Sequence, residues 1–306
     1  MRNVPAPIYP LIAVLSWGAM FPLAAIALPH VDPFNITAIR YGVASVIFVI
    51  ILATAEGRGA FSLEGQGWRL FALGSLGFAG FNLLACLALI WSQPQDVAVI
   101  VPTMPLVTVL VRWVRGGGRP SPMILSASIA ALFGVFLVVT KGDVTRLSGG
   151  LGDALTFVAV VCWVIYTMSA AKFPSWSALR YTGLTAPLGT ITILAVTAVA
   201  DAFGWQRLPA PADVAAAWWE LAFIVLFGAV AAVLAWNHGA RLLGAANTAL
   251  FIVLVPVVTL AMRIAGGYQP APAEVAGIAV VVGALVVANL SGRRTASRPV
   301  PAPAAD

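Results

Sequence analysis

Aromatic side chains lie inside strongly apolar stretches of this chain, where they could bind a small molecule. Trp17 and Trp163 each fall near the middle of such a stretch, and Tyr166 follows Trp163 by three residues. Residues three apart share one face of a helix, so Trp163 and Tyr166 predict an aromatic wall. An indole N–H at the middle of a membrane finds no headgroup, so it needs another partner. Packing against the core or lipid is the alternative role of both tryptophans.

Amide side chains occur in the same apolar stretches. Asn82 and Asn237 are examples, and Trp236 stands directly before Asn237. An unpaired amide in hydrocarbon is costly, so each must bond to another helix or face a polar cavity. Their recurrence on several stretches favours a cavity, and hydrogen bonding between helices remains the alternative. The predicted substrate-binding residues are Trp17, Asn82, Trp163, Tyr166, Trp236 and Asn237.

Three prolines within the apolar stretches are predicted hinge or gating residues: Pro102, Pro105 and Pro256. Each removes a backbone hydrogen bond and frees a carbonyl group, which produces a kink. Pro105 and Pro256 belong to one repeated spacing, because Pro105, Val107, Thr108 and Arg112 return as Pro256, Val258, Thr259 and Arg263. Duplication of the bend favours a conformational role over a proline that the helix merely tolerates.

His238 is the one histidine inside an apolar stretch, and it could titrate near neutral pH as a proton-linked group. A satisfied contact between helices is its alternative role. No acidic residue lies near the middle of a predicted span, so export of lipophilic cations, which calls for a membrane carboxylate, is disfavoured. A neutral or zwitterionic substrate needs only helix dipoles, amides and hydroxyls for its charged groups, and aromatic rings for its side chain.

The composition requires a membrane to hold these residues. Of 306 residues, 61% are hydrophobic and 9% are charged, and apolar blocks of spanning length recur along the whole chain. The net charge of +6 is scattered over short loops and a tail, which indicates membrane topology and no nucleic-acid partner. Cys86 and Cys162 lie in apolar runs, so we expect no disulfide, metal or cofactor. Motifs for zinc, serine or phosphate chemistry are lacking, so we do not expect an enzyme.

Ten membrane spans of about 20 residues are predicted. They cover roughly residues 8 to 28, 34 to 54, 68 to 92, 96 to 114, 122 to 141, 151 to 172, 177 to 200, 218 to 243, 245 to 265 and 272 to 290. The first five have counterparts in the last five: Trp17 matches Trp163, and the sequence around Arg40 and Tyr41 matches that around Arg180 and Tyr181. Five is odd, so the second copy enters from the opposite face and the halves form an inverted repeat.

The predicted fold is therefore an all-α integral membrane bundle of two five-helix inverted-topology repeats. Residues 1–145 form the first repeat, residues 146–292 the second, and residues 293–306 a disordered cytoplasmic tail. Most of the 17 lysine and arginine residues fall on the N-terminal side, so both termini should be cytoplasmic. Arg40 is counted on the other side. Small residues such as Gly134 and Gly283 should permit close helix packing.

The chain resembles the EamA type of the drug/metabolite transporter superfamily. The resemblance is carried by the inverted repeat of ten spans, by Trp17-Gly18 with Phe21, by Arg40 at the second span, and by the paired Pro-x-Val-Thr elements. It implies export of small metabolites, often amino acids, across the bacterial inner membrane, and the tryptophan-rich interior is most similar to the aromatic amino-acid exporters.

We therefore expect an alternating-access exporter of amino acids, aromatic and other neutral ones, with its cavity between the two repeats. Its partners would be a small-molecule substrate and the lipid bilayer, with the chain acting as a monomer. A transporter of sugar-linked or other neutral metabolites is the alternative, because aromatic rings stack on sugars as readily as on amino acids. A structural or receptor-like bundle is a further alternative.

Overall fold

The computed structural model of the chain describes residues 4–117, 119, 122–147 and 150–296, and within these ranges the regular structure is helical. The first half contains α1 (Ile8–Ala27), α2 (Pro33–Ala55), η1 (Arg58–Phe61), α3 (Gly67–Gly74), η2 (Ser75–Gly80), α4 (Phe81–Ala88), α5 (Pro94–Ile100), η3 (Val101–Thr103), α6 (Met104–Val114), α7 (Pro122–Thr140) and η4 (Val144–Arg146). The second half contains α8 (Leu151–Ser169), η5 (Ala170–Lys172), α9 (Ala178–Ala202), α10 (Pro211–Ala216), α11 (Trp218–Phe223), η6 (Ile224–Ala231), α12 (Ala232–Leu243), α13 (Ala245–Ala249), η7 (Leu250–Val253), α14 (Leu254–Ala265) and α15 (Pro272–Ala296).

The helices account for ten membrane spans. Within the described residues, nine helical stretches are long and apolar enough to cross a bilayer, and the apolar part of α15, Pro272–Val287, supplies the tenth. Four spans are composite: α3 with η2 and α4, α5 with η3 and α6, α11 with η6 and α12, and α13 with η7 and α14. The fold is thus the predicted bundle of ten transmembrane helices in two repeats.

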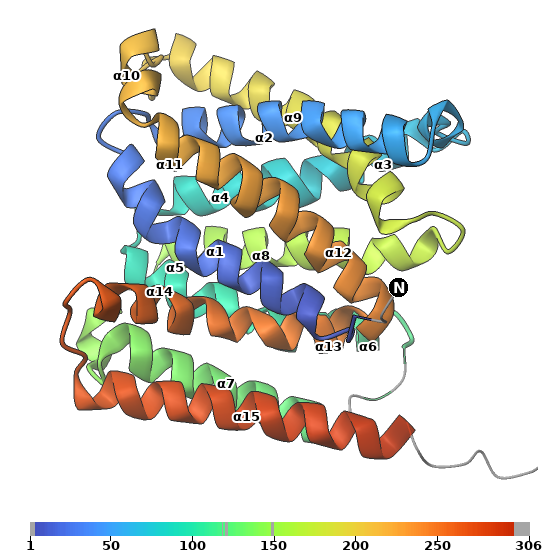
Figure 1. Ribbon diagram of the computed structural model, residues 1–306. Helices are drawn as coiled ribbons and strands as arrows, with labels where there is room; N and C mark the ends of the chain where they lie inside the picture. The colour runs from blue at the N-terminus through green and yellow to red at the C-terminus, as the bar shows by residue number, and fades with distance from the viewer. Residues whose placement is uncertain (1–3, 118, 120–121, 148–149, 297–306) are drawn as a thin grey trace, which may run out of the picture.

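Helices from the two halves lie against each other throughout the bundle (Figure 1). The pair α7 and α15 forms one edge, and the pair α2 and α9 forms the opposite edge. Between these edges, α1 packs against α12 and α14, and α4 packs against α8. The largest core cluster therefore contains side chains from both halves, including Trp17 and Trp163.

Two opposite ends of the bundle are used as reference below. The N-side is the end that carries the start of α1 together with the connections α2 to α3, α8 to α9 and α12 to α13 (Figure 1). The far side carries the connections α1 to α2 and α9 to α11. Because five spans separate the start of α1 from the start of α8, α8 crosses the membrane in the opposite direction.

Irregular backbone occurs at matching places in the two halves. A π-helical segment interrupts the third span at Ser75–Gly80 and the eighth span at Ile224–Ala231. A 3-10 turn interrupts the fourth span at Val101–Thr103 and the ninth at Leu250–Val253. π-Helical turns shift the register of backbone bonding and occur frequently at functional sites. The repeat therefore duplicates the local distortions as well as the spans.

Of the two glycines named above as permitting close helix packing, Gly134 does so and Gly283 does not. A Cβ atom on Gly134 would come within 2.8 Å of the carbonyl oxygen of Gly277, and one on Gly277 within 2.6 Å of the carbonyl oxygen of Gly134. The backbones of α7 and α15 thus touch at these two residues. Gly283, which was expected to have this role, has open space where a Cβ would lie, because it faces away from α7.

The C-terminal part of the chain is more helical than expected. Helix α15 continues to Ala296 and so takes in residues 293–296 of the segment predicted to be disordered. The remainder of that prediction, residues 297–306, lies outside the described residues. At the start of α9, the Ser177 hydroxyl caps the helix by accepting the backbone N–H of Arg180 at 2.8 Å.

Candidate functional site

Three buried tryptophans meet at the interface of the two halves. The ring of Trp17 on α1 lies 5.8 Å from that of Trp163 on α8, in an edge-to-face arrangement, and 5.2 Å from that of Trp236 on α12. Trp17 and Trp163 are the residues that the sequence matched as equivalent positions of the two repeats, and the structure places their rings in contact. We call Trp17, Trp163, Tyr166 and Trp236 the aromatic cluster.

Tyr166 extends the cluster along α8. Its ring lies 5.5 Å from that of Trp163, on the same helix face as the spacing predicted, and stacks on Tyr181 of α9 at 5.2 Å. Asn237 fixes its hydroxyl: the side-chain amide donates to the Tyr166 oxygen at 2.9 Å and to the Thr182 hydroxyl at 2.8 Å. Asn237 therefore joins α12 to α8 and α9, the interhelical bonding that the sequence left open.

Two polar atoms of this region have no protein partner. The indole N–H of Trp163 and the side-chain oxygen of Asn237 are buried and make no hydrogen bond with the described residues. A buried polar group without a partner costs about 1–3 kcal/mol. One unused donor and one unused acceptor are therefore available to a bound molecule that carries both an anionic and a cationic or hydroxyl group.

Two separate cavities lie beside the cluster and at the N-side. A narrow void of about 10 Å³, room for about one water molecule, is lined by Trp163, Trp236, Thr108 and Thr167 among others. A larger cavity of about 340 Å³ lies at the N-side ends of α8 and α12 and is lined by Arg241, Met168 and Pro174, again with Thr167. Thr167 and Ala245 line both. The larger cavity thus adjoins, through these two residues, the void beside Trp163.

Asn82 belongs to a second group of polar contacts. Its side-chain amide donates to the Phe78 carbonyl at 2.8 Å and to the Tyr41 hydroxyl at 3.3 Å, and its oxygen accepts from Arg40 at 3.4 Å. Among the described residues, Asn82 is the one predicted substrate residue that makes neither a ring contact nor a hydrogen bond to the aromatic cluster. The two groups are linked through Gly228, whose carbonyl accepts both the Trp17 indole N–H, at 2.9 Å, and an Arg40 N–H.

Arg40 is a buried charged residue beside the cluster that was not among the predicted site residues. It was counted among the charges of the far-side loops, but it lies within α2 and is 8% exposed. The sequence around Arg40 matches that around Arg180, which lies at a membrane surface. For this reason the sequence did not indicate that Arg40 lies deeper in the membrane. A usable signal was present: Arg40 follows the start of the apolar stretch by several residues, too far for a residue that only caps the helix.

The prolines lie at distortions of the fourth and ninth spans. Pro102 is within the 3-10 turn Val101–Thr103, and Pro105 begins the regular helix that follows it. Pro256 has a similar place, as the third residue of the helix that follows the 3-10 turn Leu250–Val253. The sequence predicted bends here, and their gating role stays a prediction. His238 packs against the Tyr9 ring at 4.4 Å, away from the aromatic cluster, and its proton-linked role also stays a prediction.

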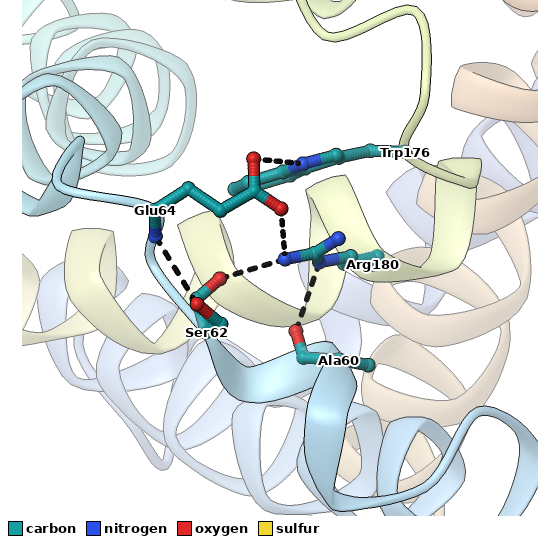
Figure 2. A network of polar contacts seen from close by, with 5 residues as sticks. All are labelled: Ala60, Ser62, Glu64, Trp176 and Arg180. Carbon is teal, nitrogen blue, oxygen red and sulfur yellow. Dashed lines mark hydrogen bonds and ion pairs between the residues drawn. The ribbon is translucent and has the colours of Figure 1, made fainter.

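A polar network joins the halves on the N-side, as Figure 2 shows. Arg180 of α9 pairs with Glu64 at 2.7 Å and donates to the carbonyls of Ala60 and Ser62, all in the loop between α2 and α3. The indole N–H of Trp176 donates to the same glutamate at 3.1 Å. These contacts tie the first half to the second at one membrane surface.

The far side has its own bonds between the halves. The carboxylate of Asp32 accepts the backbone N–H of Arg207, and the Asn35 amide donates to Asp201 at 3.0 Å. Phe34 donates its N–H to Gln206 at 3.2 Å. Both ends of the bundle thus carry polar contacts that would have to break if the halves moved apart. Among the described residues, no group of three metal-binding side chains accompanies them.

Comparison with known proteins identifies the family. The model of the EamA-like transporter family matches residues 5–140 and again residues 150–290, which together make up most of the chain. The chain belongs to the EamA-like transporter family. This EamA-like transporter is 33% identical over 292 residues to the uncharacterized transporter YrdR of Bacillus subtilis (strain 168), covering 93% of this chain and 91% of that protein.

Two more relatives cover nearly the whole EamA-like chain. The uncharacterized transporter YyaM of Bacillus subtilis (strain 168) is 30% identical over 89% of each chain. The aromatic amino acid exporter YddG of Ancylobacter novellus is 25% identical over 92% of this chain and 96% of that protein. A solved crystal structure shares the fold with a TM-score of 0.76 at 22% identity, covering 95% of this chain and 99% of its own.

Proposed function

We propose that this EamA-like transporter exports neutral amino acids, aromatic ones above all, by alternating access around the aromatic cluster. The observation that carries the proposal is the meeting of Trp17 from the first half with Trp163 and Trp236 from the second. Edge-to-face and offset rings bind another aromatic ring well. A site made from both halves is remodelled whenever the halves move relative to each other.

The direction of transport is supported by charge and by the cavities. The positive residues gather on the N-side, which favours a cytoplasmic location for that face. The cavity of about 340 Å³ lies on this face and shares Thr167 and Ala245 with the void beside Trp163. A cytoplasmic substrate would thus reach the cluster from inside a bacterial cell, through the inner membrane. The chain would act as a monomer, because each copy contains both halves of its own site.

The similarity to an aromatic amino acid exporter at 25% identity is a further support. It gives the substrate class to be tested first. Sugar-linked and other neutral metabolites are the second class, since their rings could stack on the same tryptophans.

The proposal is tested with the purified full-length chain in proteoliposomes loaded with unlabelled substrate. Uptake of labelled L-phenylalanine by exchange should saturate with concentration and be competed by L-tryptophan and L-threonine. Empty liposomes are the control. Flux no greater than in empty liposomes for all three amino acids would contradict the proposal, and saturable exchange of a nucleotide sugar in the same preparation would establish the second class.

A further inference from the structure

Arg40 is a cation inside the membrane with incomplete compensation. Its guanidinium donates to the Gly228 carbonyl and, at 3.4 Å, to the Asn82 oxygen, while its Nε–H is buried and has no partner. Its guanidinium carbon also lies 4.8 Å from the Tyr41 ring centre. Among the described side chains, the ion pairs formed by arginine belong to Arg180 and Arg207, and none involves Arg40.

Two acids at the far-side end of the bundle are occupied with other groups. Asp32 accepts from the backbone of Arg207, and Asp201 accepts from Asn35. A charged group removed from water costs several kcal/mol unless an opposite charge and hydrogen bonds replace the water. Carbonyl, amide and ring partners compensate Arg40 in part, and they leave its positive charge without a negative partner.

The repeat provides an internal comparison. Arg180 occupies the matching position in the second half, lies about 3 Å along α9 from the helix start, and pairs with Glu64 at the membrane surface. Arg40 lies about 10 Å along α2, deep enough to reach the carbonyl that also binds Trp17. An arginine that served only as an interfacial anchor would have stayed at the surface, as Arg180 does.

The π-helical segment at Ile224–Ala231 completes the arrangement. Gly228 lies within it, and its carbonyl accepts from Trp17 and Arg40, two side chains of the first half. The cation of Arg40 and the ring of Trp17 are thus both hydrogen-bonded to one carbonyl oxygen of the second half. Arginine binds carboxylates in a fork of parallel hydrogen bonds, and such a pair needs donors that the protein has not already used.

We infer that Arg40 is the anion-binding group of the substrate site and recognises a carboxylate on the molecule whose side chain contacts Trp17. The inference rests on the proposed function and makes it more specific: the substrate carries a carboxylate and is not merely aromatic. Amides, esters and amines of the same shape are rejected, because they leave the guanidinium unpaired.

The test measures ligand binding to the full-length protein in detergent by thermal shift and by titration. The probes are L-phenylalanine, 3-phenylpropionate, L-phenylalaninamide, phenethylamine and the non-aromatic carboxylate succinate. Wild-type protein should bind the two aromatic carboxylates roughly 10- to 100-fold more tightly than the amide and the amine. Arg40→Gln should lose this preference, Arg40→Lys should retain part of it, and Arg58→Gln, at an exposed loop residue, should retain all of it.

Melting without ligand separates binding from a structural role. Since the charge of Arg40 lacks a negative partner, Arg40→Gln should melt at the same temperature as wild type or higher. A lower melting temperature together with an unchanged carboxylate preference would show that Arg40 is structural and would overturn the inference. Should Arg40→Gln fail to fold, Arg40→Lys provides the same comparison with the charge retained.

The remaining outcomes distinguish the two proposals. Equal binding of L-phenylalanine and its amide, unchanged in Arg40→Gln, overturns the anion site and leaves aromatic amino-acid transport standing. Binding of succinate but of no aromatic probe, lost in Arg40→Gln, supports the anion site and overturns the aromatic substrate. Absence of binding by every carboxylate overturns both.

Discussion

Gly77 lies directly beneath the ring of Tyr166, so that a Cβ atom at this position would overlap the ring carbons. The inverted repeat contains the same contact a second time: a Cβ atom on Gly228 would overlap the sulfur of Met20. Met20 follows Trp17 by three residues, as Tyr166 follows Trp163. The same glycine contact therefore involves an aromatic ring in the second half and a flexible methionine side chain in the first. We infer that the rigid wall of the site lies on α8.

Gly77→Ala should destabilise the protein, because the added methyl group must displace Tyr166 or separate the third span from α8. Overpacking of this kind costs about 1–3 kcal/mol. The measurement is the melting temperature in detergent. Gly42→Ala on α2 is the matched control, since a Cβ there meets no atom within 4 Å and alanine favours the helix. Equal melting temperatures of the two variants would refute the contact.

Asn237→Ala should lower both stability and transport. The variant removes the amide that donates to the Tyr166 hydroxyl and to Thr182, which leaves α12 without these bonds to α8 and α9. The expected loss is about 1–3 kcal/mol, measured by thermal unfolding, together with reduced exchange of L-phenylalanine. Asn247→Ala is the control, because the exposed Asn247 amide donates to the Leu243 carbonyl, four residues earlier in the chain, and so joins no distant helices. Equal behaviour of the two variants would contradict the role of Asn237.

Glu64→Gln should weaken the network between the halves on the N-side. The Arg180 side chain is 15% exposed and that of Glu64 is 45% exposed, so their ion pair contributes about 0.3–1 kcal/mol. Its loss should favour opening of the N-side about two- to fivefold. The readout is the rate at which maleimide labels Ala240→Cys, a residue that lines the 340 Å³ cavity. Labelling of the protein without this substitution measures the background from Cys86 and Cys162.

Asp213→Asn provides the comparison for that experiment. It breaks the Arg207–Asp213 pair on the far side, in which the arginine is 64% exposed. Labelling on the N-side should not increase in this variant. An increase equal to that of Glu64→Gln would show that the network in Figure 2 does not control the N-side.

Spans, repeat and aromatic contacts could be predicted from sequence because each has a local signal. Apolar length gives the span, the spacing of Trp163 and Tyr166 gives a helix face, and the odd number of spans gives the inversion. The π-helical segment around Gly228 has no comparable signal, since its backbone register depends on packing against Met20 and Trp17. The depth of Arg40 likewise depends on where α2 begins, and element ends are difficult to place from sequence.

Trp163→Ala in proteoliposomes tests most directly whether the aromatic cluster is the transport site. The account predicts that the concentration of L-phenylalanine at half-maximal exchange rises at least about tenfold, because Trp163 contacts Trp17 and Tyr166 and lines the narrow void beside them. Trp218→Ala, at an indole that is 65% exposed, should exchange like wild type. Wild-type exchange by a monodisperse Trp163→Ala protein would contradict the account and remove this tryptophan from the site.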